Sequence, residues 1–207
     1  IVAYYTAWSI YARNFFVTDI QAEKVTHINY AFANISSGGE IVLGDRWADI
    51  EKTYPGDSWD DPLRGNFNAL LNLKQRHPHV RTLISVGGWT WSGRFSDAAV
   101  SEDSRSRFAA SCVDFMTRYG FDGVDIDWEY PVSGGLSSNR TRAEDRENFT
   151  LLLAELRRQI NVRGIADGRS YLLTIAAPAG SGTYANIEID RIHPLLDWIN
   201  LMSYDFN

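Results

Sequence analysis

The sequence predicts an α/β fold in which helices cover a parallel β-sheet. Short continuous apolar runs, rich in β-branched and aromatic residues, alternate along the chain with patterns of helical spacing. Such runs are typical of strands that are buried on both faces. Strands that alternate with helices favour a parallel sheet, because each helix returns the chain to the start of the next strand.

Six strands and three long helices are predicted in this order. The strands are expected at Val2–Thr6, Val25–Ala33, Arg81–Val86, Gly123–Trp128, Tyr171–Ala177 and Trp198–Tyr204. The helices are expected at Phe67–Arg76, Ser104–Tyr119 and Asn148–Val162. The first helix ends before Pro78, which cannot continue a helix, and the second ends at Gly120, the residue type favoured just past a helix end. The long polar segment Asn34–Gly65 is expected on the functional face, where long loops usually lie.

Composition and charge narrow the classes of partner. The 207 residues are 44% hydrophobic and 22% charged, which is typical of one globular domain, and no linker divides them. A net charge of −6 argues against a nucleic-acid partner, which would need clustered Lys and Arg. No apolar run approaches the roughly 20 residues that span a bilayer, so no membrane partner is expected. The first residues lack the basic and apolar regions of a signal peptide.

Two further residue classes carry little functional signal. Cys112 is the only cysteine, so it cannot form an intrachain disulfide, and its helical apolar neighbours favour a buried structural thiol. Triplets that begin at Asn34, Asn139 and Asn148 match the N-glycosylation pattern, which also arises by chance.

The fourth strand carries the most informative residues. Because side chains alternate along a strand, Asp125, Asp127 and Glu129 share one face, and the apolar residues between them face the helices. Crowded carboxyls in a buried strand repel one another, which raises the pKa of at least one and keeps a proton available near neutral pH. Glu129, at the end of the row, is the natural proton donor. The alternatives are a solvated acidic edge, or a Mg²⁺ or Ca²⁺ site, for which no supporting ligand set is visible; we expect no metal or cofactor.

Residues 122–129 resemble the Asp-Gly-x-Asp-x-Asp-x-Glu signature of glycoside hydrolase family 18. Ser85-Val-Gly-Gly-Trp89 is similar to the family's third-strand motif, Met202-Ser-Tyr-Asp205 to its sixth-strand motif, and Tyr4-Tyr-x-x-Trp8 to the first strand of its bacterial and fungal chitinases. The resemblance implies a TIM (β/α)₈ barrel. Residues 1–207 would form one catalytic domain with about the first six βα units, C-terminally incomplete. A missing C-terminal segment or a second chain would then complete the barrel, because the first and last strands would otherwise leave unpaired edges.

The resemblance also implies a role for each acid. Glu129 would protonate the glycosidic oxygen and later activate water as a base. The 2-acetamido carbonyl of the substrate, rather than a protein carboxylate, would attack the sugar, with net retention. Asp127 would orient the acetamido group. Asp125 would either share a proton with Asp127 or repel its charge.

Further residues are assigned by the same resemblance. Tyr204 would hold the acetamido oxygen, and Trp89 would form an aromatic platform on the leaving-group side of the cut. Substrate contacts are also expected from Asp205, Met202, Tyr130, Phe32 and Tyr4, while Tyr4 and Ser85 would hydrogen-bond Asp125. The sequence does not place Trp47, Trp59 and Trp91, which could extend the cleft. Non-proline cis peptides are expected at Ala31-Phe32 and Glu129-Tyr130.

The expected function is therefore that of an extracellular chitinase acting on chitin or N-acetylglucosamine oligomers. Two alternatives stay open. An endo-β-N-acetylglucosaminidase acting on N-glycans shares the acidic signature, although the sixth-strand motif argues against it. A non-catalytic chitinase-like lectin would commonly lose an acid from the signature, and here Asp125, Asp127 and Glu129 are all present.

Overall fold

The computed structural model describes residues 1–58 and 60–205, and its centre is one curled sheet of six parallel strands. The strands lie in the order β1 (Val2–Thr6), β2 (His27–Ile35), β4 (Arg81–Gly87), β5 (Gly123–Asp127), β6 (Leu172–Pro178) and β7 (Trp198–Met202). A two-residue strand, β3 (Ile41–Val42), pairs antiparallel with β2. The predicted strands are thus confirmed, but four predicted boundaries extend past the observed strands. Val25 and Tyr171 lie before the first residue of their strands. Trp128 and Tyr204 both lie beyond the last residue of their strands.

Helices connect the strands on the outer side of the sheet. The α-helices are α1 (Gly65–Arg76), α2 (Gly88–Trp91), α3 (Phe95–Ala99), α4 (Glu102–Tyr119), α5 (Asp145–Asp167), α6 (Ser181–Tyr184) and α7 (Ile189–Ile192). Short 3₁₀ helices lie at Ala7–Ile10, Val17–Asp19, Ala22–Lys24, Ser92–Arg94 and His193–Leu195, and a π-helical turn lies at Trp47–Glu51. Helix α4 begins at a capping box between Ser101 and Ser104. It ends at Gly120, which has φ 72° as a left-handed C-cap requires.

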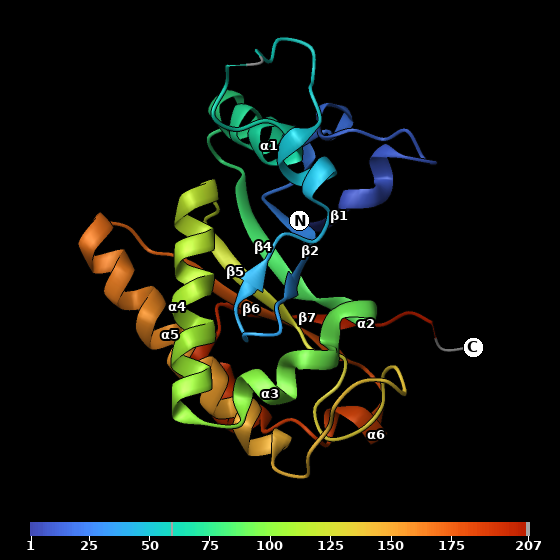
Figure 1. Cartoon of the computed structure of the whole chain (residues 1–207), viewed down its shortest axis with the longest axis vertical. Helices are drawn as coiled ribbons and strands as arrows, with labels where there is room; N and C mark the ends of the chain where they lie inside the picture. The colour runs from blue at the N-terminus through green and yellow to red at the C-terminus, as the bar shows by residue number, and fades with distance from the viewer. Residues whose placement is uncertain (59, 206–207) are drawn as a thin grey trace.

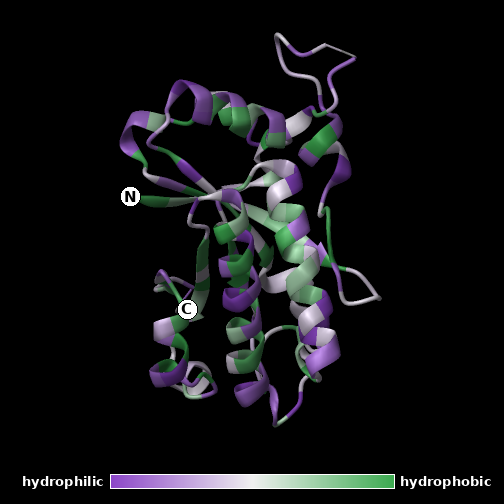
Figure 2. Cartoon of the chain, turned by 90° about the vertical axis from the view of Figure 1, so that its left-hand side faces the viewer, coloured by the Kyte–Doolittle hydropathy of each residue, from purple (hydrophilic) through white to green (hydrophobic). Residues whose placement is uncertain are grey.

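The three long helices contain the predicted ranges and are longer. Helix α5 continues to Asp167 because Gly168, with φ 66°, ends it there. Figure 1 shows α4 and α5 side by side along one flank of the sheet. Figure 2, which faces that flank, shows hydrophobic and hydrophilic stretches alternating along these helices, as expected when one stripe packs on a sheet.

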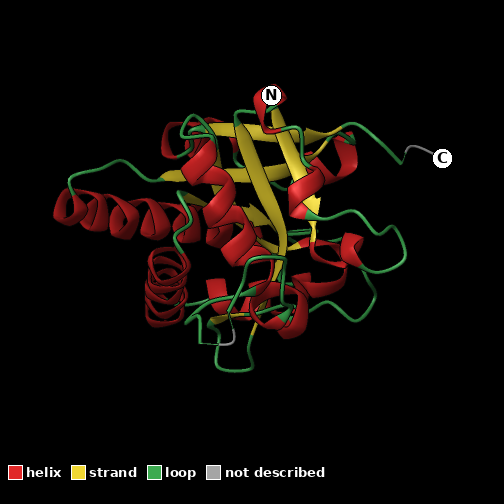
Figure 3. Cartoon of the chain, turned by 90° about the horizontal axis from the view of Figure 1, so that it is seen from above, coloured by secondary structure: helices red, strands yellow, loops and turns green. Residues whose placement is uncertain are grey.

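Contacts between strands that are not neighbours show how strongly the sheet curls. The Tyr4 hydroxyl of β1 donates to Asp125 on β5, although β2 and β4 lie between these strands. The rings of His27 on β2 and Trp198 on β7 lie 4.7 Å apart, centroid to centroid. Figure 3 shows the strands gathered at the centre with helices around them. The sheet is therefore a curled half-barrel, part of the predicted TIM barrel, and among the described strands β1 and β7 each pair on one side only.

The segment between β2 and α1 differs from the expected loop. It contains β3 and the π-helical turn, whose Asp49 is buried and accepts a hydrogen bond from the Tyr30 hydroxyl at 2.6 Å. The residues that follow leave the body at the top of Figure 1, at the opposite end from α3 and α6. None of its described residues lines the cleft presented below. The segment contributes only indirectly, because Gly44 lies so close to the Trp91 ring that a Cβ would be 2.4 Å from it.

Candidate active site

Strand β5 and the two residues that follow it present three acidic side chains to the inside of the curled sheet. Asp125, Asp127 and Glu129 are 0%, 4% and 8% exposed. Trp128, which alternates with them, points the other way and stacks on Phe95 of α3, with ring centroids 5.4 Å apart. The predicted division of β5 into an acidic inner face and an apolar helix-facing side is therefore confirmed. The helix packing fixes the direction in which the acids point.

Asp125 is the most completely hydrogen-bonded member of the row. Its Oδ2 accepts from the Tyr4 hydroxyl and from the Ser85 hydroxyl, each at 2.8 Å. Its Oδ1 accepts from Thr174 Oγ1 at 2.5 Å and from Asn200 Nδ2 at 3.2 Å. The strand register explains this arrangement, because Ser85 on β4 and Thr174 on β6 are the direct partners of Asp125.

Burial and hydrogen bonding act in opposite directions on Asp125. Complete burial raises the pKa of Asp125, and the donors from Thr174, Ser85, Tyr4 and Asn200 lower it, with burial the larger effect. The pKa of Tyr4 is raised in turn by burial and by the Asp125 charge, so its hydroxyl keeps its proton and remains a donor.

Asp127 lies between the other two acids and has less support. Its Oδ1 is buried and makes no hydrogen bond. Burial, followed by the charges of Glu129 and Asp125, raises the pKa of Asp127 well above its usual range. An unpartnered buried carboxyl oxygen is costly, so Asp127 is suited to hold a proton or to receive a donor from a ligand.

Glu129 stands at the end of the row, where the sheet opens. Burial raises the pKa of Glu129, and the Tyr130 hydroxyl partly opposes this by hydrogen bonding. The Glu129-Tyr130 peptide bond is cis, as predicted. A carboxyl whose proton is retained toward neutral pH, at the wall of an open cleft, can act as a general acid.

A cleft of about 940 Å³ lies at the carboxyl ends of the parallel strands, with lining residues from β1–β2 as well as from β4 to β7. Its described lining consists of Trp8, Phe32, Gly87, Trp89, Thr90, Trp91, Asp127, Glu129, Tyr130, Pro178, Ala179, Gly180, Thr183, Met202, Tyr204 and Asp205. Six of these side chains are aromatic rings, and aromatic faces bind flat, partly apolar surfaces. Among the described residues, the carboxyl groups on this lining belong to Asp127, Glu129 and Asp205.

A bulge in β2 directs one of these rings into the cleft. The register between β2 and β4 shifts between Ala31 and Ala33, which leaves Phe32 as the extra residue. Bulges re-aim side chains in this way. Phe32 lies 6.1 Å from Trp8, centroid to centroid, and the Ala31-Phe32 peptide bond is cis, as predicted.

The residues at and after the end of β7 supply a further part of the lining. Met202, Tyr204 and Asp205 all line the cleft. Tyr204 shares this lining with Asp127 and Glu129, and the pKa of Tyr204 is raised by burial and then by the charges of these two acids.

The structure sorts the predicted residues into two groups. Eight of them line the cleft: Phe32, Trp89, Asp127, Glu129, Tyr130, Met202, Tyr204 and Asp205. Asp125, Ser85 and Tyr4 are not among the described lining residues, and Tyr4 makes the predicted bond to Asp125. Trp91 lines the cleft, Trp47 does not, and Trp59 lies outside the described residues.

Several residues of this site were not predicted. Thr174 and Asn200 complete the donors to Asp125, and Ser92 and Asn139 hydrogen-bond the main chain of Glu129. Strand pairing could have indicated Thr174, because it follows from the register of β6. No sequence signal indicates the other three.

Two other kinds of feature are not found in the part of the chain that the structure describes. No group of three or more His, Cys, Asp or Glu side chains is placed to hold a metal ion within residues 1–58 and 60–205. In the same residues, no helix combines the length and apolarity needed to cross a bilayer.

Comparison with known proteins places this geometry in a family. The sequence profile of glycosyl hydrolases family 18 matches residues 1–207. Chitinase A1 of Niallia circulans is 50% identical over 237 aligned residues, which cover 100% of this chain and 34% of that protein. Endochitinase 1 of Metarhizium anisopliae is 40% identical and aligns with 99% of this chain and 47% of its own length. The chain therefore spans about a third to a half of these curated relatives.

Solved structures agree with the sequence comparison. Chitinase ChiA74 from Bacillus thuringiensis superposes with a TM-score of 0.95 at 43% identity, covering 100% of this chain and 40% of that one. The catalytic domain of chitinase B from Arthrobacter TAD20 gives 0.94 at 32% identity, with 100% and 58% coverage. A family 18 N-acetylglucosaminidase from Paenibacillus barengoltzii gives 0.80 at 35% identity, with 99% and 53% coverage.

Proposed function

The chain belongs to glycosyl hydrolase family 18, and from that premise we propose that it is the acid-bearing part of a chitinase, which hydrolyses β-1,4 bonds between N-acetylglucosamine residues. The observation that carries the proposal is the row of three buried carboxyls that ends at an open, aromatic-lined cleft. Such a row has one clear chemical use. It retains a proton at Glu129 for delivery to a leaving group.

The proposed substrate fits the cleft in polarity as well as shape. Chitin is neutral, and each sugar presents flat apolar faces that can pack on the rings of Trp8, Trp89 and Trp91. The net charge of −6 does not hinder an uncharged polymer. An extracellular location follows from a substrate that is an insoluble polymer.

We further propose a retaining mechanism assisted by the substrate. Glu129 protonates the glycosidic oxygen, and the carbonyl oxygen of the 2-acetamido group attacks the anomeric carbon as the bond to the leaving group breaks. The unpartnered Oδ1 of Asp127 supports this assignment, because it can accept the acetamido N–H. Tyr204, near the same acids, is available to donate to the acetamido oxygen. The acetamido attack forms an oxazolinium ring. Glu129, now deprotonated, then takes a proton from the water that attacks the anomeric carbon and opens this ring.

The direct test compares two glutamate-to-glutamine variants in the natural full-length protein. Glu129→Gln keeps the shape of the side chain and removes its titratable proton, so kcat on N-acetylglucosamine oligomers should fall about 10²- to 10⁴-fold. Oligomer binding should persist. Glu147→Gln, at an exposed position in the first turn of α5, is the control and should leave kcat unchanged. Near-normal turnover by Glu129→Gln would refute the assignment.

Substrate variation tests the mechanism and the competing functions. A thiazoline analogue of the oxazolinium ion should inhibit, because it resembles a state that the site stabilises. Rapid cleavage of a fully deacetylated glucosamine oligomer would contradict acetamido participation. Release of glycans from a high-mannose glycoprotein in preference to chitin oligomers would instead indicate an endo-β-N-acetylglucosaminidase, and binding without cleavage would indicate a lectin.

A further inference from the structure

The main chain at Glu129 lies beyond the sheet that positions the other two acids. Strand β5 ends at Asp127, so no strand pairing holds residue 129. Glu129 nevertheless has a buried, defined position. Its N–H and its C=O are each hydrogen-bonded by a side chain from another part of the chain.

Ser92 holds the N–H side. Its Oγ accepts from the Glu129 N–H at 2.8 Å and lies within donating distance of Gly88 O, at 2.8 Å, and of Asp127 O, at 3.1 Å. Ser92 is completely buried. One hydroxyl therefore links the segment after β4 to the backbone on both sides of Trp128.

Asn139 holds the C=O side. Its Nδ2 donates to Glu129 O at 3.0 Å. The fit around that oxygen is close, because a Cβ at Gly135 would lie 2.1 Å from it. Gly135 has φ 72°, so both its conformation and its surroundings favour glycine. The loop between β5 and α5 thus folds back on the residue that precedes it.

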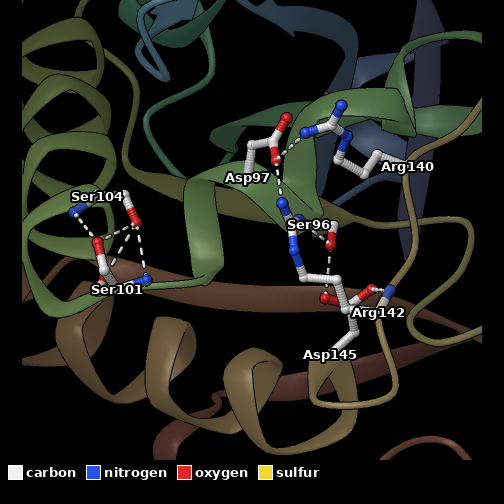
Figure 4. A network of polar contacts seen from close by, with 7 residues as sticks. All are labelled: Ser96, Asp97, Ser101, Ser104, Arg140, Arg142 and Asp145. Atoms are coloured by element: carbon white, nitrogen blue, oxygen red, sulfur yellow. Dashed lines mark hydrogen bonds and ion pairs between the residues drawn. The ribbon is translucent and has the colours of Figure 1, made fainter.

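A network of polar contacts fixes that loop to the segment that contains Ser92 (Figure 4). Arg142 donates to Ser96 Oγ at 2.6 Å and to Asp97 Oδ1 at 2.6 Å. The buried Asp145 accepts from Ser96 Oγ at 2.7 Å and from the Arg142 N–H at 2.7 Å.

Arg140 adds a second connection between the loop and this segment. Its side chain contacts Asp97 at 3.4 Å, and its N–H donates to Gly93 O at 3.3 Å. Residues 92–97 therefore anchor both hydrogen bonds to Glu129.

From these contacts we propose that Ser92 and Asn139 are positioning residues that clamp the Glu129 peptide and aim its carboxyl at the glycosidic oxygen. The clamp, defined as these two side chains, rests on the proposed function of Glu129 as general acid. Neither side chain is among the described cleft-lining residues, so the clamp acts through the main chain that it holds and not by contact with a substrate. The clamp contributes by keeping the Glu129 carboxyl in position, because a displacement of about 1 Å in a catalytic group can cost on the order of 10²-fold in rate.

This role gives the clamp a signature that a merely structural contact lacks. A sugar leaving group must be protonated as it departs, whereas a nitrophenolate leaves with little help from an acid. A misaimed Glu129 should therefore slow cleavage of an N-acetylglucosamine oligomer far more than cleavage of a 4-nitrophenyl glycoside of the same sugar. Loss of folded protein would slow both by the same factor.

The test measures kcat/KM and KM for both substrates in the natural full-length protein carrying Asn139→Ala or Ser92→Ala. On the oligomer we expect kcat/KM to fall about 10- to 100-fold with KM within about twofold of wild type. On the nitrophenyl glycoside the fall should stay within about threefold. Asn186→Ala is the matched control, because Asn186 also donates through Nδ2, at 3.2 Å, but to Ser133 and not to Glu129. It should leave both substrates unaffected.

Each other outcome is decisive. If kcat/KM falls equally on the two substrates, or on neither, the clamp is overturned. The proposed function would still stand in that case, because wild type and Asn186→Ala would remain active. A wild-type protein inactive on both substrates would overturn the proposed function, and the clamp with it. If Asn139→Ala does not fold, Asn139→Asp gives the same comparison, because it keeps the side-chain shape and removes the Nδ2 donor.

Discussion

Burial of Asp125 makes the stability of the fold depend on pH, and the hydrogen bonds to Asp125 oppose this dependence. Thr174→Val should expose the contribution of one of these bonds. The substitution keeps a buried side chain of similar shape and removes the hydroxyl that donates to Asp125 Oδ1. A hydrogen bond to an ionised acceptor contributes about 1.5–3 kcal/mol, and one to a neutral acceptor about 0.5–1.5 kcal/mol. Thr174→Val should therefore lose about 1–1.5 kcal/mol more of its free energy of unfolding when Asp125 is ionised than when it is neutral. This difference corresponds to a further rise of about one unit in the pKa of Asp125.

How the stability changes with pH follows from the direction in which the pKa of Asp125 is shifted. Its pKa in the folded protein is raised above the usual 3.8, so its contribution to stability is present at low pH and lost as pH rises through the folded value. Thr174→Val raises the pKa of Asp125 further. Urea unfolding, followed by tryptophan fluorescence from about pH 4.5 to about pH 9, should show a free-energy deficit that grows with pH.

Thr150→Val is the matched control for this measurement. Thr150 is also buried and also donates to a carboxylate, Glu188, at 2.7 Å. That bond lowers the pKa of Glu188 below its usual 4.5, so Glu188 stays ionised above that pH and the deficit of Thr150→Val should be constant. A constant deficit for Thr174→Val over the same range would refute the reasoning about Asp125.

Two further predictions concern packing around the acid row. Phe95→Ala removes a fully buried ring that stacks on Trp128, and urea unfolding should show a loss of about 3–5 kcal/mol. Gly135→Ala should lower kcat on N-acetylglucosamine oligomers by at least about tenfold, because its Cβ would displace the Glu129 carbonyl. Gly168→Ala, also at positive φ but with nothing within 4 Å, should cost about 1–2 kcal/mol of stability and leave kcat unchanged.

The sequence was sufficient to predict the elements whose signals are local. The alternation of Asp125, Asp127 and Glu129 fixed the inner face of β5, and Gly120 marked the end of α4. The end of β5 was predicted one residue late because Trp128 continues the apolar alternation, although Ser92 rather than a neighbouring strand bonds the next peptide.

The residues that hydrogen-bond the acids were harder to predict because they come together only in the tertiary structure. Asn200 is 75 positions from Asp125, and Ser92 is 37 positions from Glu129. Asn139 matches a glycosylation triplet, yet the structure uses its amide to bind a main-chain carbonyl. Such pairings depend on how the sheet curls and where loops return, and neither property has a period along the chain.

The unequal support of the three acids determines where a proton in the row resides. Burial raises the pKa of Asp125, but four donors converge on its carboxylate and limit that rise. A charge on Asp125 in turn raises the pKa of Asp127, which has no donor on Oδ1 to stabilise a charge of its own. Asp127 is therefore the member that holds a proton most firmly, and a neutral Asp127 leaves Glu129 free to release and recover its own proton without a charged neighbour. Donors placed at the bottom of the row, on β1, β4, β6 and β7, thereby tune the acid at the cleft without touching it.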